Sequence, residues 1–90
     1  MSVQVRIPSQ LRQVTQGESL IEMDPATVGG IIMELENRNP GIAERLLEDG
    51  ELRRFINIYV DGDDIRFADG LATEVSDGSE VSIVPAVAGG

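Results

Sequence analysis

The first residues of the chain alternate between apolar and polar side chains. Val3, Val5 and Ile7 are apolar and the residues between them are polar, which is the period-two pattern of a half-buried β-strand. A proline follows and marks the end of this strand. Residues 9–17 predict a turn, and residues 18–23 predict a second strand that runs antiparallel to the first.

A helical pattern comes next. Its apolar residues recur at positions i, i+3, i+4 and i+7, and these are Val28, Ile31, Ile32 and Leu35. Thr27 is well placed to be the N-cap, and Asn39 precedes a proline, which biases it away from helical geometry. The pattern therefore predicts a helix that begins after Thr27 and ends within residues 37–41.

Two glycines, Gly29 and Gly30, fall in the first turn of this predicted helix. Each costs up to about 1 kcal/mol relative to alanine in a helix. We therefore expect a close packing contact that requires them. The alternative is a phosphate-binding loop, but no GxGxxG pattern surrounds the pair and no lysine follows it.

The middle of the chain predicts a short second helix over residues 42–49 and a central strand over residues 55–60, where β-forming residues are dense. Alternation places one set of this strand's side chains toward the main helix, namely Ile56, Ile58 and Val60. The opposite set is Phe55, Asn57 and Tyr59. Phe55 and Ile58 are candidates for docking a partner, and core packing is the alternative for each.

Three Asp-Gly pairs fall in the last third of the chain, and two of them predict turns. Asp61-Gly62 is the strongest hairpin signal, and it predicts a short strand over residues 64–67. Asp77-Gly78 predicts a turn before a last strand over residues 81–85. The acidic run at 61–64 resembles a calcium loop, but the third ligand, the glycine and the twelfth position of such a loop fall on Ile65, Arg66 and Ala72.

The predicted order is strand, strand, helix, short helix and three further strands. This is the order of a β-grasp domain, an α+β fold in which a mixed sheet of about five strands packs on one main helix. We assign residues 1–85 to this domain and residues 86–90 to a flexible C-terminal tail. Ninety residues leave no room for a second core.

Composition excludes several classes of function. The chain has no His, Cys, Lys or Trp, so it lacks the commonest general base, the thiolate nucleophile and the Schiff-base amine. A conventional active site and a metal site of the chain's own are not expected. No apolar run is long enough to span a membrane, and no signal peptide is recognisable. The expected location is the cytoplasm, and the expected free state is a monomer.

The net charge is −9, from 7 basic and 16 acidic residues. Binding to phosphates requires clustered cations, so the charge argues against a nucleic-acid partner. An acidic face could steer the domain onto a basic partner surface. The alternative is that the charge serves only solubility.

The tail offers the most distinctive chemistry. The chain ends at Gly89-Gly90, preceded by the small apolar residues Ala86, Val87 and Ala88. Because glycine lacks a Cβ, such a tail could thread a narrow active-site cleft. Adenylation by ATP would give the Gly90 carboxylate a leaving group. The alternative is a frayed chain end.

Several segments carry a resemblance to a known family, and they are residues 54–60, 64–67, 70–73 and 84–90. In these the chain resembles the ubiquitin-like sulfur carriers of the MoaD and ThiS group, and within that group its middle segments favour the CysO branch of actinobacterial cysteine synthesis. The resemblance runs across nearly the whole chain.

The resemblance implies a carrier and not an enzyme. An E1-like enzyme would adenylate Gly90 with ATP, and a sulfur donor would convert the carboxylate to a thiocarboxylate, with Gly89, Ala88, Val87 and Ala86 entering the partner's active site. In the CysO branch the acceptor is an activated serine on a PLP-dependent cysteine synthase, and a zinc metalloprotease of the JAMM type releases cysteine. ATP, PLP and zinc would belong to these partners.

Other acceptors and other classes stay open. The same tail would suit the small subunit of molybdopterin synthase, or a sulfur donor for a thiosugar or another sulfur-containing natural product. From different classes come a ubiquitin-like protein modifier conjugated through Gly90 and a plain interaction module whose terminal glycines are incidental.

Overall fold

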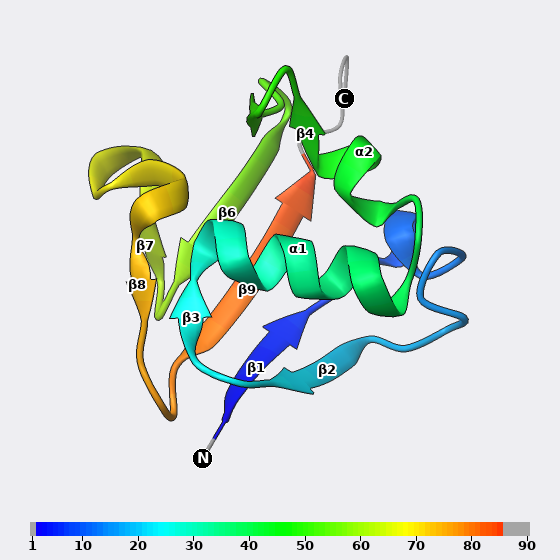
Figure 1. Cartoon of the computed structure of the whole chain (residues 1–90), viewed down its shortest axis with the longest axis horizontal. Helices are drawn as coiled ribbons and strands as arrows, with labels where there is room; N and C mark the ends of the chain where they lie inside the picture. The colour runs from blue at the N-terminus through cyan, green and yellow to red at the C-terminus, as the bar shows by residue number, and fades with distance from the viewer. Residues whose placement is uncertain (1, 86–90) are drawn as a thin grey trace.

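The computed structural model describes residues 2–85 of the 90-residue chain. Its main sheet contains β1 (Val3–Arg6), β2 (Leu20–Met23), β6 (Ile56–Val60), β7 (Asp63–Asp64) and β9 (Glu80–Pro85). The strand order is β2-β1-β9-β6-β7. The helix α1 (Val28–Arg38) lies across one face of this five-stranded sheet (Figure 1). The predicted β-grasp fold is confirmed.

The register of the sheet aligns its apolar side chains. β1 and β9 are parallel neighbours at the centre, whereas β2, β6 and β7 pair antiparallel with their neighbours. Val5 lies opposite Ile21 on one side and Val81 on the other, and Ile58 lies opposite Ile83. Because side chains alternate between the faces of a strand, all five point to the same side.

The core lies between this side of the sheet and α1. The helix contributes the four apolar residues that its sequence pattern predicts, each at most 2% exposed: Val28, Ile31, Ile32 and Leu35. From β6, Ile56 and Ile58 are buried and Val60 packs against the core. The predicted inward face of this strand is therefore confirmed, and each fully buried aliphatic side chain contributes about 1.5–3 kcal/mol to stability.

The start of α1 explains its two glycines. Thr27 is the N-cap, since its Oγ1 accepts a hydrogen bond from the Gly30 N–H at 3.1 Å. A Cβ on Gly29 would lie only 3.3 Å from the carbonyl oxygen of Leu71, and a Cβ on Gly30 would lie 3.2 Å from the Cβ of Ala26. The glycines therefore permit the close packing that their sequence position predicts.

The helix α2 (Ile42–Leu46) is joined to α1 by a tight turn. Gly41 has a φ of 105°, a conformation that favours glycine. The Glu36 carboxylate accepts hydrogen bonds from the N–H groups of Gly41 at 3.1 Å and Ala43 at 3.0 Å. These bonds satisfy N–H groups that would otherwise lack a partner at the start of α2.

The prediction that this second helix runs to residue 49 is wrong. It ends at Leu46, and a small hairpin of β4 (Leu47–Glu48) and β5 (Glu51–Leu52) follows. Asp49 and Gly50 form its turn with φ values of 55° and 80°. Two consecutive positive φ values are typical of a two-residue hairpin turn, for which Asp-Gly is a favoured sequence.

The predicted strand over residues 64–67 is also wrong, although the Asp61-Gly62 hairpin before it is confirmed by the pairing of β6 with β7. The strand β7 stops at Asp64, and the 3-10 helix η2 (Ile65–Phe67) follows. The cause is local: Asp64 Oδ1 accepts a hydrogen bond from the Arg66 N–H at 2.8 Å and caps η2.

The remaining elements are short. The 3-10 helix η1 (Ser9–Leu11) opens the predicted turn, and β2 begins two residues later than predicted. The two-residue strands β3 (Ala26–Thr27) and β8 (Glu74–Val75) pair with each other, and the 3-10 helix η3 (Gly70–Ala72) packs beside α1. Within residues 2–85, no helix is long and apolar enough to cross a membrane.

Candidate functional site

The predicted site residues Gly90, Gly89 and 86–88 lie outside the described residues. The structure does fix the point from which the chain leads to them. Pro85 is the last residue of β9 and lies opposite Ile56, the first residue of β6. The tail therefore begins at one end of the central part of the sheet.

The strand that leads to the tail has a partner on both sides at its start and pairs with β6 alone at its end. β9 pairs with β1 and with β6, and its residues Val81 and Ile83 are at most 3% exposed. A strand with two partners and a buried inner face is far less mobile than a loop. The tail therefore follows a strand whose start is held on both sides and whose end is held by β6.

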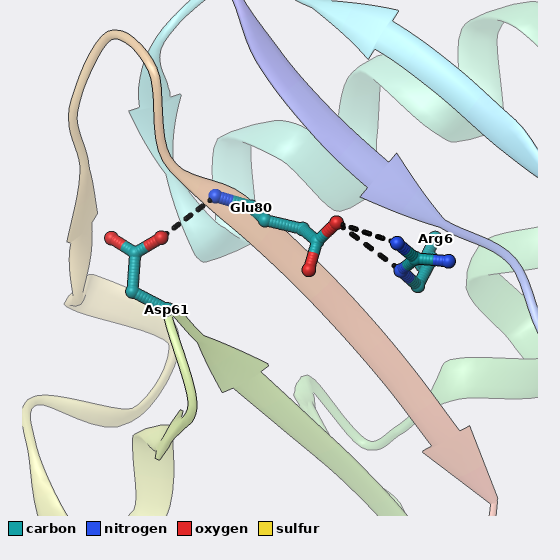
Figure 2. A network of polar contacts seen from close by, with 3 residues as sticks. All are labelled: Arg6, Asp61 and Glu80. Atoms are coloured by element: carbon teal, nitrogen blue, oxygen red, sulfur yellow. Dashed lines mark hydrogen bonds and ion pairs between the residues drawn. The ribbon is translucent and has the colours of Figure 1, made fainter.

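A polar network fastens the opposite end of β9 (Figure 2). The Asp61 carboxylate accepts a hydrogen bond from the Glu80 N–H at 3.0 Å, and Glu80 Oε2 accepts one from Arg6 Nε at 3.2 Å. The bond from Glu80 N–H, together with one from the Ser79 hydroxyl, lowers the pKa of Asp61 below its usual value. The network ties the β6–β7 turn and β1 to the start of the last strand.

A cleft lies where β9 ends. It has a volume of about 430 Å³, and Figure 1 shows β9 ending beside α2 and β4, which supply part of its wall. Its lining includes Arg45, Glu48, Arg53, Arg54, Phe55 and Pro85. Three arginines against one glutamate make the cleft positively charged in a chain whose net charge is −9.

The two candidate docking residues differ in their exposure to solvent. Ile58 is 1% exposed and belongs to the core, so its candidacy as a docking residue is wrong. Phe55 is 54% exposed, so the core-packing alternative is wrong for it. Val84 on β9 is 43% exposed, and its pairing partner Asn57 lies two residues after Phe55 in the chain. Two exposed apolar side chains thus lie beside the start of the tail.

The loop that carries Phe55 is held by Arg66. Its guanidinium donates hydrogen bonds to the carbonyl oxygens of Arg53 at 2.9 Å and Ile56 at 2.7 Å, and to Asn57 Oδ1 at 2.7 Å. A planar guanidinium can make several directed bonds at once. Arg66 therefore connects η2 to both ends of the segment that forms the cleft wall.

Replacing Arg66 with lysine should lower the free energy of unfolding by about 1–2 kcal/mol, because an ammonium group cannot reproduce this fork of bonds. Amide hydrogen exchange at Ile56, whose N–H donates to the Arg53 carbonyl at 3.0 Å, should become faster. Urea unfolding and exchange measurements on Arg66→Lys check this, with Arg38→Lys as the matched control away from the cleft. Unchanged exchange at Ile56 would show that Arg66 does not hold the loop.

Sequence reasoning missed the arginines of this cleft and the role of Arg66. The usable signal was the dipeptide Arg54-Phe55 directly before a strand whose alternation places Phe55 away from the helix. Within residues 2–85, no group of three or more His, Cys, Asp or Glu side chains could hold a metal ion. Beside the start of the tail, the described residues place three arginines and the exposed side chains of Phe55 and Val84.

The sheet order, the parallel central pair and the helix across one face define a ubiquitin-like domain, whose central strand here leads into a Gly-Gly tail. The model of the ThiS family matches residues 5–90, and the chain belongs to this family. It is a homologue of sulfur carrier proteins.

Three similar proteins are informative. Sulfur carrier protein CysO of Mycobacterium tuberculosis is 47% identical over 93 residues, which cover all of both chains. A chain in the crystal structure of the Amycolatopsis orientalis BexX/CysO complex matches with a TM-score of 0.93 and 50% identity, covering 98% of this chain and 99% of that one. Small archaeal modifier protein 3 of Haloferax volcanii is 38% identical over 92 residues, again all of both chains.

Proposed function

We propose that this protein carries sulfur as a thiocarboxylate on Gly90 and is not itself an enzyme. The observation that carries the proposal is a β-grasp domain, homologous over its full length to a sulfur carrier, whose central strand β9 leads into the tail that ends in Gly-Gly. A folded domain with a short tail suits delivery of a terminal group into a partner's active site.

The proposed chemistry has two steps. A carboxylate oxygen of Gly90 attacks the α-phosphorus of ATP on an E1-like enzyme, which displaces pyrophosphate and leaves an acyl adenylate. A hydrosulfide ion, supplied by a sulfur donor, then attacks the acyl carbon. AMP leaves, a carbon–sulfur bond replaces the carbon–oxygen bond, and Gly90 ends in a thiocarboxylate.

For the acceptor we propose the CysO route, which the 47% and 50% identities to CysO chains support. A PLP-dependent cysteine synthase would supply an activated serine. The thiocarboxylate sulfur would form a bond to the β-carbon of this serine as its leaving group departs, and the acyl group would move from sulfur to the amino nitrogen. A zinc metalloprotease of the JAMM type would then hydrolyse the resulting amide, which releases cysteine and returns the Gly90 carboxylate. The A. orientalis neighbour was solved in a complex with BexX, which supports a carrier that works by docking on a partner protein.

A pull-down with the 90-residue chain as bait distinguishes the acceptors. Capture of a cysteine synthase that then accepts sulfur from the loaded chain would support the CysO route. Capture of the large subunit of molybdopterin synthase or of a sugar-modifying synthase would replace it with one of the alternative routes.

Protein modification is a second candidate function, because the H. volcanii relative is named a modifier protein. Conjugation through Gly90 to lysines of other proteins would give a ladder of higher-mass adducts in cell lysate probed for this chain. A Gly90-dependent ladder would establish this function, and a lysate without adducts would reject it.

Replacing Gly89 with phenylalanine should reduce adenylation by about 100-fold, because a side chain next to Gly90 misplaces the carboxylate within a narrow cleft. ATP–pyrophosphate exchange by the activating enzyme measures this step, and Gly89→Ala serves as the smaller matched change. Normal exchange with Gly89→Phe would show that the partner's cleft is wider than the proposal requires.

A further inference from the structure

Two of the seven arginine side chains differ from the other five in their polar contacts. Within residues 2–85, no hydrogen bond or ion pair involves the side chain of Arg45 or Arg54. The remaining arginines each bind a carbonyl or a carboxylate oxygen, and these are Arg6, Arg12, Arg38, Arg53 and Arg66. Arg45 and Arg54 thus keep their guanidinium groups available to a partner.

Both of these arginines line the cleft beside Pro85. Arg45 comes from α2 and Arg54 from the loop before β6, and both are exposed. The Arg54 guanidinium lies 5.7 Å from the centroid of the Phe55 ring, within the range of a cation–π contact. This contact restricts both side chains, so less conformational entropy is lost when a partner binds them.

We propose that Arg45, Arg54 and Phe55 dock the enzyme that activates Gly90. This enzyme presents carboxylates around an apolar pocket that receives the Phe55 ring. The inference rests on the proposed function and specifies the partner surface. A guanidinium pairs with a carboxylate through two parallel hydrogen bonds, and arginine and aromatic residues are enriched in the cores of interfaces.

The carboxylates that we place on the rim of the partner's docking surface do not conflict with the chemistry at Gly90. An acidic surface close to the reaction would repel the tail carboxylate and ATP. Five residues separate Pro85 from the end of Gly90, and an extended chain of that length reaches about 17 Å. This reach exceeds the Debye length of about 8 Å at physiological ionic strength. Rim carboxylates can therefore attract the arginines without weakening adenylation.

The charge around the cleft is opposite in sign to the net charge of the chain. The sequence suggests a basic partner surface for a chain of −9, and that expectation still applies to surfaces remote from the tail. Around the cleft the sign is reversed. Because exposed charges are screened beyond about 8 Å at physiological ionic strength, the close arginine–carboxylate pairs decide the orientation in which the carrier docks.

The test is ATP–pyrophosphate exchange by the activating enzyme of the same organism, with the full chain as the varied substrate. The variants are Arg45→Gln with Arg54→Gln, and the charge reversal Arg45→Glu with Arg54→Glu. The matched control is Met33→Glu with Asn37→Glu, two exposed positions on α1 that change the net charge as much as the glutamine pair. Thermal melting confirms that each variant is folded.

For the charge reversal we expect the KM for the carrier to rise about tenfold or more, with kcat at saturating carrier unchanged. The glutamine pair should give a smaller rise, the control none, and the effect should shrink as salt increases. An unchanged KM for the reversal, or an equal rise in the control, would overturn the docking surface while leaving the carrier function intact. Absence of exchange with the wild-type chain would instead reject the proposed function and the docking surface together.

Discussion

Deletion of Gly90 should abolish sulfur loading and leave the melting temperature unchanged. Without Gly90 the terminal carboxylate belongs to Gly89 and lies about 3.5 Å short of its former reach. Reacting atoms must approach to about 3–3.5 Å for catalysis, so the carboxylate no longer meets the α-phosphorus of ATP. Stability should be retained because the sheet and the buried core are formed by residues within 2–85.

ATP–pyrophosphate exchange and thermal melting check this prediction. Gly90→Ala is the matched control, because it keeps the length of the chain and should retain more exchange than the deletion. If the deletion variant exchanged pyrophosphate normally, the end of the chain would not be the reacting group. A large fall in melting temperature would show that the tail contributes to the folded domain.

Truncating Ile58 should have the largest effect on stability. We expect Ile58→Ala to lower the free energy of unfolding by about 2–5 kcal/mol, since this side chain is 1% exposed on a strand between two neighbours. Phe55→Ala should change it by less than about 1 kcal/mol, because Phe55 is 54% exposed. Phe55→Ala should instead raise the KM of the activating enzyme for the carrier, as loss of an aromatic anchor does at interfaces.

Urea unfolding of both variants measures the free energy of unfolding, and ATP–pyrophosphate exchange by the activating enzyme measures the KM for the carrier. The two residues lie three positions apart on the same segment, so each serves as the control for the other. If Phe55→Ala were the more destabilising change, or if it left the KM unchanged, Phe55 would have no part in docking.

Periodic segments of the sequence predicted most of the fold. The alternation in β1 and β6 and the i, i+3, i+4, i+7 pattern in α1 reflect burial on one side only, and burial is what the structure shows for Val5, Ile58 and Leu35. Such patterns are reliable because one face of each element must exclude water. The parallel pairing of β1 with β9 follows from the fold and not from any local pattern.

Short elements were the source of error. The hairpin of β4 and β5 has only two residues on each side, too few for periodicity, yet Asp49-Gly50 is the same kind of turn signal that correctly predicted the hairpin at Asp61-Gly62. The stretch 64–67 contains β-forming residues, but one bond from the Arg66 N–H to the Asp64 side chain favours a 3-10 turn. β3 and β8 pair across 46 or more intervening residues, and no local signal specifies that pairing.

The chemistry of the tail was predictable from the sequence, whereas its surroundings were not. Gly89-Gly90 is visible as a terminal motif, and its role remains a prediction because it lies outside the described residues. The cleft beside Pro85 is assembled from α2, β4 and the loop before β6, and only the folded chain brings Arg45 and Arg54 to the same place. Arg66 acts through backbone carbonyl oxygens, which leave no trace in a sequence.

The most direct test of the carrier function is high-resolution intact mass of the 90-residue chain after incubation with ATP, a sulfur source and extract of the host, followed by alkylation with a thiol-directed reagent. Alkylation is needed because oxidation of one of the three methionines changes the mass by nearly as much as exchanging oxygen for sulfur. We expect a gain in mass that is alkylatable and that disappears when Gly90 is deleted. A chain that gains no alkylatable sulfur, in an extract that loads a known carrier, would contradict the proposed carrier function.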